Sequence, residues 1–422
     1  MKVVIMAGGK GSRITSVASD IPKPMIKIDG IPVMEREIQC LKEQGFDDLI
    51  ITVSHLGHVI MNYFGDGSNF GVHIEYFVEE QPLGNAGALF ELKDKLTEDF
   101  LLLNADAIFD IDFNRFVKFH KEKGGLVTLF THPNSHPYDS GLIIADNSGA
   151  VDQWLTKEDN RPKYYKNRVN AGLHVVSPEV LAARPKGAKV DLDRQMLKPL
   201  AGTGKMFCYD SPEYVKDMGT PERYEEVCKD FADGVVSSKN LKRKQKAIFL
   251  DRDGTINKYV GFLRDINEFE LIDGVADAIG KINRSGYLAI VVTNQPVISR
   301  GEVNYEQLQE IHNKMETLLG LEGGYLDGIY YCPHHPHKGY EGEIPKLKFD
   351  CDCRKPKPGM LLKAAEDFNV SLDDSWMIGD GENDIKAGQE AGCKTALIGG
   401  GEFGQNRKGK KLLEIVTEIL GD

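Results

Sequence analysis

The stretch that decides the fold of the C-terminal half reads Ala247-Ile248-Phe249-Leu250-Asp251-Arg252-Asp253-Gly254-Thr255. Four apolar residues predict a short buried strand, and two carboxylates two positions apart follow at its end. Asp251 and Asp253 should therefore point into the same crevice, where they would repel each other. A Mg²⁺ ion relieves that repulsion, because hard cations take carboxylate oxygens. One carboxylate can then attack phosphorus while the other protonates the departing alkoxide.

Three further polar pieces follow in order, each after an apolar strand. Thr293 and Asn294 offer a hydroxyl and an amide to a phosphoryl group. Lys355 supplies a cation from a loop that prolines stiffen, and Asp380, with Asp384 four residues on, would complete the Mg²⁺ shell. A single aspartate in such a place is often only a turn residue or a helix cap. The four pieces in this order favour phosphoryl chemistry instead.

This ordered set resembles the haloacid dehalogenase superfamily of phosphatases over about residues 246–420. The resemblance implies that Asp251 is the nucleophile and Asp253 the general acid/base. It also implies one Mg²⁺ ion beside a phosphoryl group that polar side chains hold. The implied Mg²⁺ ligands are Asp251, Asp253 (through its backbone carbonyl) and Asp380, and the implied phosphate-binding residues are Thr293, Asn294, Arg354 and Lys355.

A cluster of cysteines and histidines lies between these pieces. Cys332-Pro333-His334-His335-Pro336-His337 is followed by Cys351-Asp352-Cys353. Free core cysteines beside exposed histidines are one interpretation, but two cysteines two positions apart in a loop rich in Gly, Pro and Lys are poor candidates for a core. Three thiolates and one imidazole form a closed tetrahedral set, which is typical of structural Zn²⁺. The sequence therefore predicts zinc bound by Cys332, Cys351, Cys353 and one histidine, either His334 or His335.

The cysteine loop narrows the resemblance. Cys-x-His, with His334 as the ligand, matches the zinc loop of the heptose-bisphosphate and histidinol-phosphate phosphatases, which leads into Arg-Lys-Pro-Lys-Pro-Gly-Met as residues 354–360 do here. Within that group the chain looks most like the D-glycero-D-manno-heptose 1,7-bisphosphate 7-phosphatases, through residues 251–257 and through Thr293-Asn294-Gln295 with Arg300-Gly301. This resemblance implies that Arg300 also binds substrate.

The N-terminal half opens with an apolar strand that runs into Ala7-Gly8-Gly9-Lys10-Gly11-Ser12-Arg13. Glycines let backbone N–H groups approach a polyphosphate closely, and an arginine adds a bidentate phosphate ligand. The loop is neither a Walker A loop nor a dinucleotide-binding motif. Lys23, in a loop fixed by prolines, and the small-residue turn 83–88 strengthen the pattern. Asp106 and Asp217 are far apart in sequence but could share one Mg²⁺ on the nucleotide phosphates.

Together these features resemble the sugar-1-phosphate nucleotidyltransferases over about residues 1–228. The implied nucleotide-binding residues are Gly8, Gly9, Gly11, Arg13, Lys23, Gly84 and Gly87, the implied Mg²⁺ ligands are Asp106 and Asp217, and the implied sugar-phosphate residues are Lys157, Asn170 and Gly172. Lys157 lacks the Glu-Lys-Pro context that is usual in that family. An ordinary surface lysine is therefore an equal interpretation at this position.

Short apolar strands alternate with helical stretches, which predicts mostly parallel α/β sheets covered on both faces. The rhythm breaks at residues 232–245, a polar and charged stretch that we interpret as a linker. The expected fold class is α/β with two domains, a Rossmann-like nucleotidyltransferase domain over 1–231 and a haloacid-dehalogenase-like domain with a zinc loop over 246–422. The expected strands are Val3–Met6, Leu49–Val53, Ile74–Val78, Phe100–Leu103, Val127–Phe130, Ala247–Leu250, Leu288–Val292, Gly328–Tyr331, Trp376–Ile378 and Thr395–Ile398, and the expected helices include Val33–Glu43 and Ala86–Leu96.

The bulk composition limits the possible partners. The formal net charge of −12 argues against nonspecific nucleic-acid binding, because neutralising phosphates requires a cationic face. No apolar run approaches the length of about 20 residues that spans a membrane, and the N-terminus is not typical of a signal peptide. Seven cysteines, three of them beside histidines, indicate metal binding in a reducing compartment. We therefore expect a cytoplasmic protein that acts on small molecules.

The two halves fit one reaction route. A 7-phosphatase acting on heptose 1,7-bisphosphate yields a sugar 1-phosphate, which a nucleotidyltransferase consumes with release of pyrophosphate. The hypothesis is a bifunctional enzyme that makes a nucleotide-activated heptose. Residues 16–24 resemble the heptose-1-phosphate guanylyltransferases, which favours GTP and the α-anomer. The residues themselves leave the base, the anomer and the oligomeric state open.

Two alternatives stay open at this point. One is a mannose-1-phosphate guanylyltransferase joined to a phosphatase of other specificity, such as one for histidinol phosphate. The other is a chain in which one domain only binds its ligand. The complete carboxylate sets of both halves argue against that second alternative, because a binding module has no need of them.

Overall fold

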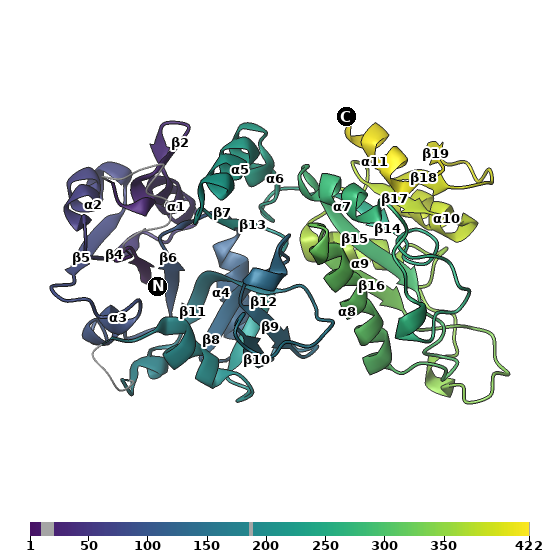
Figure 1. Cartoon of the computed structure of the whole chain (residues 1–422), viewed down its shortest axis with the longest axis horizontal. Coiled ribbons are helices and arrows are strands. Elements are labelled where there is room, and N and C mark those ends of the chain that lie inside the picture. The colour runs from purple at the N-terminus through teal and green to yellow at the C-terminus, as the bar shows by residue number, and fades with distance from the viewer. Residues whose placement is uncertain (10–20, 185–188, 422) are drawn as a thin grey trace. The chain divides into compact units, whose positions relative to one another are not determined.

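The computed structural model describes residues 1–9, 21–184 and 189–421, so that two of the predicted nucleotide-binding residues, Gly11 and Arg13, lie outside the described residues. The chain divides into two compact units (Figure 1). Unit 1 comprises Met1–His132, Gly141–Asp159 and Val169–Asn240, and unit 2 comprises Pro133–Ser140, Asn160–Arg168 and the C-terminal part from Leu241. The last crossing falls inside the expected linker. Two short segments of the N-terminal half, 133–140 and 160–168, also belong to unit 2. The sequence did not predict this.

Unit 1 contains thirteen strands and six α-helices among the described residues. The strands are β1 (Val3–Met6), β2 (Lys27–Ile28), β3 (Ile31–Pro32), β4 (Asp48–Val53), β5 (His73–Val78), β6 (Phe100–Asn104), β7 (Ala107–Asp110), β8 (Val127–His132), β9 (Leu142–Ala145), β10 (Val151–Leu155), β11 (Val169–Val176), β12 (Met206–Asp210) and β13 (Tyr214–Asp217). The helices are α1 (Val33–Lys42), α2 (Gly57–Phe64), α3 (Gly87–Glu91), α4 (Phe113–Lys123), α5 (Pro221–Ala232) and α6 (Val235–Ser238).

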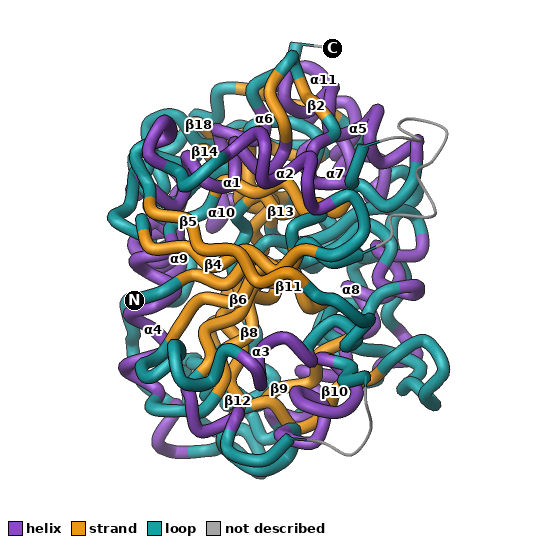
Figure 2. The backbone as a smooth tube through the Cα atoms, turned by 90° about the vertical axis from the view of Figure 1, so that its left-hand side faces the viewer, coloured by secondary structure: helices purple, strands orange, loops and turns teal. Residues whose placement is uncertain are grey.

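The main sheet of unit 1 has nine strands in the order β10-β9-β11-β6-β1-β4-β5, with β8 paired to both β11 and β12. β1 is parallel to β4 and β6, as expected, but β11 runs antiparallel to β6, β8 and β9. The expectation of a mostly parallel sheet is therefore wrong for this unit. The physical reason is that β9, β10 and β11 follow one another without the crossover helix that parallel pairing requires. Figure 2 shows the twist of the sheet from β5 to β12.

The two faces of this sheet are covered by different helices. Val3 and Ile5 of β1 lie in a buried cluster with side chains of α1, α2 and α4, whereas Val4 packs on the other side with α3. This alternation follows from the two-residue period of a strand. Helix α3 is shorter than the predicted helix at 86–96, and it ends at Glu91.

The expected linker differs from the prediction. Helix α6 lies within it, and Val235 and Val236 are buried in an apolar cluster of unit 1 together with Ile26 and Val33. Two adjacent valines are too few to produce a helical period in the sequence. The segment is therefore packed at its start rather than solvated throughout.

Unit 2 is built on a six-stranded parallel sheet in the order β16-β15-β14-β17-β18-β19. Its strands are β14 (Lys246–Leu250), β15 (Tyr287–Asn294), β16 (Gly328–Cys332), β17 (Trp376–Gly379), β18 (Lys394–Ile398) and β19 (Arg407–Gly409). Its helices are α7 (Val275–Asn283), α8 (Tyr305–Leu321), α9 (Gly359–Phe368), α10 (Glu382–Ala391) and α11 (Leu412–Leu420). All five strands expected in this half are confirmed to within two residues at each end.

Helices cover both faces of the parallel sheet, as predicted. Ile248 and Leu250 of β14 pack with α7, α8 and α11, whereas Ala247 and Phe249 pack with α9 and α10. β14 is a central strand and is buried on both faces. In such folds ligands bind at the carboxyl ends of the parallel strands, which is where residue 251 directly follows β14. Among the described residues, none of the helices combines the length and apolar character needed to cross a bilayer.

Candidate active sites and metal cluster

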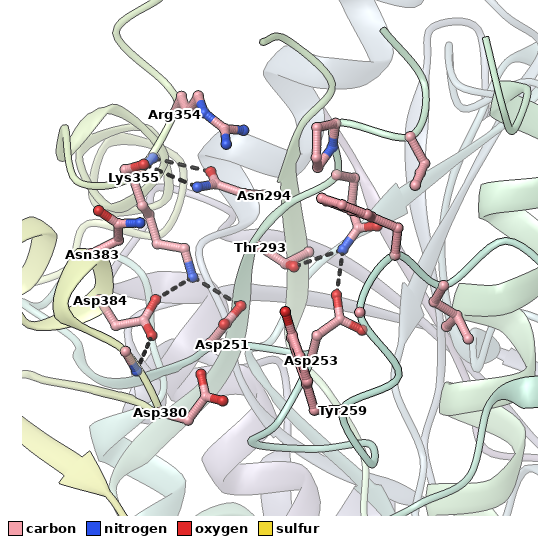
Figure 3. A pocket seen from close by; sticks show the side chains of 17 residues that line it. Asp251, Asp253, Tyr259, Thr293, Asn294, Arg354, Lys355, Asp380, Asn383 and Asp384 are labelled. Carbon is pink, nitrogen blue, oxygen red and sulfur yellow. Dashed lines mark hydrogen bonds and ion pairs between the residues drawn. The ribbon is translucent and has the colours of Figure 1, made fainter. Parts of the chain in front are cut away.

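A cavity of about 240 Å³ opens at the carboxyl ends of β14, β15 and β17 (Figure 3). It collects the residues that the sequence placed in one phosphatase site. The predicted residues that line it are Asp251, Asp253, Thr293, Asn294, Arg354, Lys355 and Asp380. These side chains come from four segments spread over residues 251–380, and the order of the parallel strands brings them together.

Lys355, itself buried, pairs with two carboxylates of the cavity, of which Asp384 is buried and Asp251 is partly exposed. Its Nζ lies 2.8 Å from Asp251 Oδ1 and 2.6 Å from Asp384 Oδ1. Burial raises the pKa of Asp251 to about 6, although the charge of Lys355 opposes this. Burial also works against the charge of Lys355, but the two carboxylates outweigh it and raise the pKa of that ammonium group. Lys355 is thus held as a cation where a phosphoryl group would meet Asp251.

Three carboxylates could hold a cation in this cavity. One oxygen from each of Asp251, Asp380 and Asp384 lies within 4.8 Å of the others. Burial and the nearby charge of Asp251 raise the pKa of Asp380 to about 6, which indicates an excess of negative charge that a divalent cation would neutralise. Gly254, at φ +84°, lets the chain pass this group, because a Cβ there would lie 2.0 Å from Asp380 Oδ2. The donor set is all oxygen and fits Mg²⁺.

Asp253 has a different environment from Asp251. Its carboxylate accepts hydrogen bonds from Arg252, Gln295 and Asn257, and Arg252 reaches both of its oxygens. Asp253 therefore stays at the cavity wall, and Asp384 rather than the Asp253 side chain completes the carboxylate group. Asp384 was not among the Mg²⁺ ligands predicted from the sequence, where it stands four residues after Asp380.

Asn294 and Thr293 act mainly on neighbouring groups. The amide of Asn294 donates to the backbone carbonyl of Lys355 and accepts from its N–H, both at 3.0 Å. Asn294 thus clamps the loop that presents Lys355, a role that the sequence prediction of direct phosphoryl contact did not include. Thr293 is buried, and its hydroxyl accepts a hydrogen bond from Gln295.

Arg300 does not line the cavity directly. Its guanidinium lies between the rings of Phe262 and Tyr340, 3.8 Å and 4.3 Å from their centroids. Phe262 does line the cavity, so Arg300 supports an exposed aromatic side chain at the rim. Its predicted role in substrate binding stays a prediction, and the structure shows a supporting position behind the rim.

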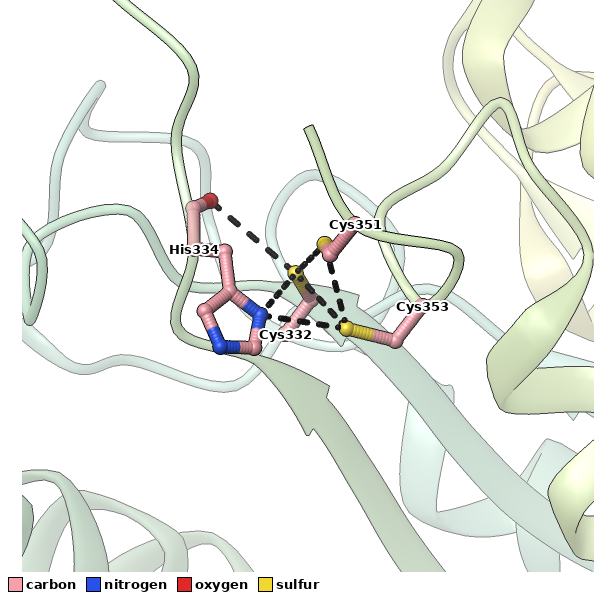
Figure 4. Close-up of side chains that lie close together, drawn as sticks. All are labelled: Cys332, His334, Cys351 and Cys353. Atoms are coloured by element: carbon pink, nitrogen blue, oxygen red, sulfur yellow. Dashed lines mark hydrogen bonds between the residues drawn. The ribbon is translucent and has the colours of Figure 1, made fainter. Parts of the chain in front are cut away.

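The four predicted metal ligands of the cysteine loop converge (Figure 4). The sulfur of Cys353 lies 3.3 Å from those of Cys332 and Cys351, and 3.3 Å from Nδ1 of His334. Hydrogen bonding from Cys332 lowers the pKa of Cys353 to about 5. The structure answers which histidine joins the group: His334 does, while His335 packs against His337 and Tyr340.

In unit 1 the structure brings the two predicted Mg²⁺ ligands together. β13 pairs with β7 so that Asp217 lies opposite Ala107, next to Asp106. The Nζ of Lys23, itself nearly buried, lies 2.8 Å from Asp106 Oδ2. Asp217 pairs with Arg223 at 2.7 Å. Two carboxylates and a lysine thus share one end of this unit, as nucleotide phosphates with a divalent cation would require.

The glycines that the structure describes show close backbone packing. Gly84, at φ +83°, lies so near Val190 that a Cβ would be 2.3 Å from its carbonyl oxygen. Gly87 begins α3, and Gly8 lies beside the Ser54 hydroxyl, which donates to its carbonyl at 2.8 Å. Gly9 differs from these, because none of the described residues comes within 4 Å of the position that a Cβ would take there.

The candidate sugar-binding residues have unequal support. Asn170 is held in place, because its Oδ1 accepts from the Gly172 N–H at 3.3 Å and contacts His174 Nε2 at 3.2 Å. Gly172, at φ +76°, leaves no space for a side chain against Asn104. Lys157 lies exposed in a turn, which fits the alternative of an ordinary surface lysine equally well.

Sequence reasoning missed several residues of the phosphatase cavity. Arg252 and Gln295 were quoted within motifs but received no role, although each directly follows or precedes a predicted site residue. Tyr259, Phe262 and Asn383 line the cavity and were not considered. An exposed aromatic pair in a loop directly after the Asp-x-Asp motif is the signal that could have identified the first two.

Comparisons with known proteins match the two halves separately. The nucleotidyl transferase family model matches residues 2–234, and a HAD-hydrolase-like model matches residues 352–417. The D-glycero-beta-D-manno-heptose-1,7-bisphosphate 7-phosphatase of Pasteurella multocida is 43% identical over 178 residues, which cover 42% of this chain and 94% of that protein. The protein of the same name from Haemophilus influenzae is 46% identical over 153 residues, which cover 36% of this chain and 80% of that protein.

A solved structure also overlaps unit 1. It is that of HddC from Yersinia pseudotuberculosis, which is 24% identical, covers 55% of this chain and 99% of its own, and has a TM-score of 0.48. That similarity is too low to bear on function. The family match covers more than half of the chain, and the phosphatase relatives are matched over most of their length. The chain therefore belongs to the nucleotidyl transferase family through its N-terminal part and to the family of these phosphatases through its C-terminal part, and it is a bifunctional enzyme.

Proposed function

We propose that this enzyme makes a nucleotide-activated heptose in two consecutive steps. Unit 2 removes the C7 phosphate of D-glycero-D-manno-heptose 1,7-bisphosphate, and unit 1 transfers a guanylyl group from GTP to the heptose 1-phosphate that results. The observation that carries the first step is the position of Lys355, which places a fixed cation against Asp251 at the base of a cavity. The relatives matched over most of their length are named for this bisphosphate.

The phosphatase step follows from the geometry of the cavity. An oxygen of Asp251 attacks phosphorus, the bond from phosphorus to the C7 oxygen breaks, and its electron pair stays on that oxygen. The departing oxygen takes a proton from the Asp253 carboxyl group, and an aspartyl phosphate remains on Asp251. Lys355 balances the charge of the phosphoryl oxygens. Mg²⁺, which Asp251, Asp380 and Asp384 would hold, supplies additional positive charge at the phosphoryl group when bound.

Water then completes the reaction. Asp253, now ionised, accepts a proton from a water molecule whose oxygen attacks the aspartyl phosphate. Inorganic phosphate leaves and Asp251 is regenerated. The exposed aromatic rim, Tyr259 and Phe262, provides a surface on which the sugar can pack.

The cysteine cluster is proposed to hold Zn²⁺ in a structural role. Three sulfurs and one imidazole nitrogen lie close enough to share one tetrahedral ion, and the group has no open position for substrate. The backbone carbonyl of His334 accepts a hydrogen bond from Arg354 at 3.2 Å. Zinc would thereby fix the loop that carries Arg354 and Lys355 into the cavity.

In unit 1 the proposed reaction is attack by the sugar 1-phosphate on the α-phosphorus of GTP, with pyrophosphate as the leaving group. The protein needs only to orient two anions and reduce their repulsion. Lys23 and the pair Asp106 and Asp217 support this, because they combine a fixed cation with ligands for Mg²⁺. Gly8, Gly9, Gly84 and Gly87 would let the nucleotide approach the backbone, and Asn170 with Gly172 would contact the sugar.

The two steps are ordered by chemistry. Removal of the C7 phosphate leaves the C1 phosphate, which is the nucleophile of the transfer. The chain thus joins the enzyme that produces a sugar 1-phosphate to the one that consumes it. The product proposed for unit 2, a sugar 1-phosphate, is therefore of the chemical class that the reaction proposed for unit 1 consumes.

The direct test measures phosphate release from the α- and β-anomers of heptose 1,7-bisphosphate separately, and pyrophosphate release with each nucleoside triphosphate and each sugar 1-phosphate. We expect phosphate from one heptose bisphosphate and pyrophosphate from GTP with the matching heptose 1-phosphate. Failure to release phosphate from both anomers would refute the heptose assignment. A preference for mannose 1-phosphate over heptose 1-phosphate would instead select the alternative transferase substrate.

A further inference from the structure

We infer that Arg252 is a positioning residue of the phosphatase, which orients the carboxyl group of Asp253 toward the leaving oxygen of the substrate. The inference rests on the proposed phosphatase function. Arg252 stands between the two aspartates of the site in sequence, yet its side chain is fully buried and is among the largest fully buried side chains in the described part of the chain. It does not line the cavity, whereas Asp253 does.

The guanidinium of Arg252 donates hydrogen bonds to both carboxylate oxygens of Asp253. Its Nη2 donates to Oδ1 and Oδ2 of Asp253 at 2.9 Å each, and its Nε donates to Oδ1 at 3.2 Å. A planar guanidinium that reaches both oxygens fixes the plane of the carboxylate, which a single contact would leave free to rotate. The direction of the Asp253 oxygens is therefore set from behind the cavity wall.

Gln295 connects this ion pair to Thr293 by hydrogen bonds. Its Nε2 donates to Asp253 Oδ2 and to Thr293 Oγ1, both at 2.9 Å, and its Oε1 accepts from Arg252 Nη2 at 3.0 Å. Gln295 is itself buried. The amide of Gln295 therefore links Arg252, Asp253 and Thr293, of which the last two line the cavity.

His312, which also contacts the guanidinium of Arg252, carries no charge that would weaken the ion pair with Asp253. His312 Nε2 lies 3.3 Å from Arg252 Nη1, and burial together with the charge of Arg252 lowers the pKa of His312 well below its usual value. The imidazole is thus neutral and can accept a hydrogen bond from the guanidinium. A buried cation is costly unless it is paired, so the pairing with Asp253 stabilises both groups.

This arrangement matters most for an alkyl leaving group. When the ester bond breaks, a sugar alkoxide must receive the Asp253 proton, and Asp253 becomes an anion that Arg252 already faces. A nitrophenolate leaving group is stable as an anion near neutral pH and needs no proton from Asp253. The loss of orientation at Asp253 should therefore slow alkyl ester cleavage far more than aryl ester cleavage.

The experiment compares Arg252→Met and Arg252→Lys with the unmodified full chain on two substrates, heptose 1,7-bisphosphate and p-nitrophenyl phosphate. Single-turnover measurements follow release of the alcohol or of nitrophenolate, which reports formation of the aspartyl phosphate alone. We expect Arg252→Met to lose about 100-fold on the sugar ester, the scale of general acid catalysis, while the nitrophenolate burst keeps its rate. Arg252→Lys should lose less of the rate on the sugar ester than Arg252→Met, because lysine keeps the positive charge but cannot donate to both carboxylate oxygens as the planar guanidinium does.

Two controls separate positioning from general damage. Asp327→Asn removes a buried charge of the same unit away from the cavity, where Asp327 accepts a hydrogen bond from the Ala289 N–H, and it should change both substrates equally or not at all. Gln295→Leu should reproduce the ester-dependent loss without removing a buried cation. If Arg252→Met does not fold, Gln295→Leu and Arg252→Lys carry the test.

A double-mutant cycle gives the decisive result. If Arg252 acts through Asp253, then Arg252→Met added to Asp253→Asn should cause no further loss on the sugar ester. Additive losses, or equal losses on both esters in Arg252→Met and Gln295→Leu, would overturn the inference and leave Arg252 a structural residue. An unmodified enzyme that cleaves neither ester would instead refute the proposed phosphatase function.

Discussion

The Nζ of Lys355 lies 2.8 Å from Oδ1 of Asp251 at the carboxyl edge of a parallel sheet, where Lys355 is buried and Asp251 is partly exposed to the cavity. The two residues are more than 100 positions apart in sequence, and Asn294 holds the backbone of Lys355 by two hydrogen bonds. This pair sets the proposed nucleophile beside a fixed cation. It explains why Asp251 can approach an anionic phosphoryl group without the repulsion that two negative charges would otherwise cause.

Replacing Lys355 by Met should reduce phosphate release by about 100-fold or more, because one fixed electrostatic contact to a developing charge is worth that much. Stopped assays of inorganic phosphate with heptose bisphosphate measure the loss. Lys357→Met is the matched control, since Lys357 lies two positions away and pairs with Asp350 on the loop surface. Equal losses in the two variants would show that the loop, rather than the Lys355 contact, is responsible.

The affinity of unit 2 for Mg²⁺ should fall as the pH falls through about 6. The pKa values of Asp251 and Asp380 are both raised to about 6, chiefly by burial, so both carboxyl groups take up protons there in the metal-free protein. A raised carboxyl pKa means that ionisation costs stability as the pH rises from the unfolded value, near 4, through about 6. Mg²⁺ removes that cost.

Thermal unfolding with and without Mg²⁺ at pH 5 and pH 7.5 measures this effect. The increase in Tm on adding Mg²⁺ should be larger at the higher pH, and calorimetric titration near pH 6 should show proton release on binding. Asp380→Asn should reduce the pH dependence. A Tm increase that is the same at both pH values would contradict the assignment of this carboxylate group as the cation site.

Removing one ligand of the cysteine cluster should destabilise unit 2. Cys353→Ala should lower the free energy of unfolding by more than about 3 kcal/mol, as expected when a structural metal is lost. Metal analysis of the purified protein should find one zinc per chain, and none in the variant. Cys393→Ala is the control, because Cys393 is another cysteine of unit 2 that is buried but lies outside the cluster. Full zinc content in Cys353→Ala would refute the ligand set.

Replacing Lys23 by Ala should affect only the transferase reaction. Lys23 is nearly buried and lies 2.8 Å from Asp106, so its removal takes a fixed cation from the nucleotide site. Pyrophosphate release should fall by about 100-fold, while phosphate release from heptose bisphosphate stays unchanged. Lys27→Ala, an exposed lysine of β2, serves as the control. Loss of phosphate release in Lys23→Ala would mean that the two reactions depend on each other.

The regular parts of the fold were accessible from sequence because they follow simple rules. The apolar runs of β1 and β14 have the length of buried strands, and β1 agrees with its prediction at both ends. The antiparallel position of β11 was not accessible, because the pairing direction depends on whether a helix intervenes, and the loop before β11 gave no clear period. Segments 133–140 and 160–168 belong to unit 2 because of contacts with residues distant in sequence. Such contacts produce no local sequence pattern from which they could be predicted.

Site residues could be predicted where the chemistry allows only a few residue types. They could not be predicted where the role depends on the direction in which the side chain points. Asp251 and Asp380 were identified because each carboxylate directly follows an apolar strand, as suits a phosphoryl site. The role of Asn294 was not identified, because the residue type fits phosphate binding and loop clamping equally. Arg252 was missed because a side chain between two site residues gives no sign in sequence that it turns inward.

The central claim is that the two activities act in order on one sugar. The most direct measurement supplies heptose 1,7-bisphosphate and GTP to the unmodified chain and to Asp251→Asn, and follows nucleotide-linked heptose by mass spectrometry. The unmodified chain should form it with one phosphate and one pyrophosphate per molecule. Asp251→Asn should form none from the bisphosphate but should form it normally from heptose 1-phosphate. Formation from the bisphosphate by Asp251→Asn, or failure of the unmodified chain to use heptose 1-phosphate, would contradict the account.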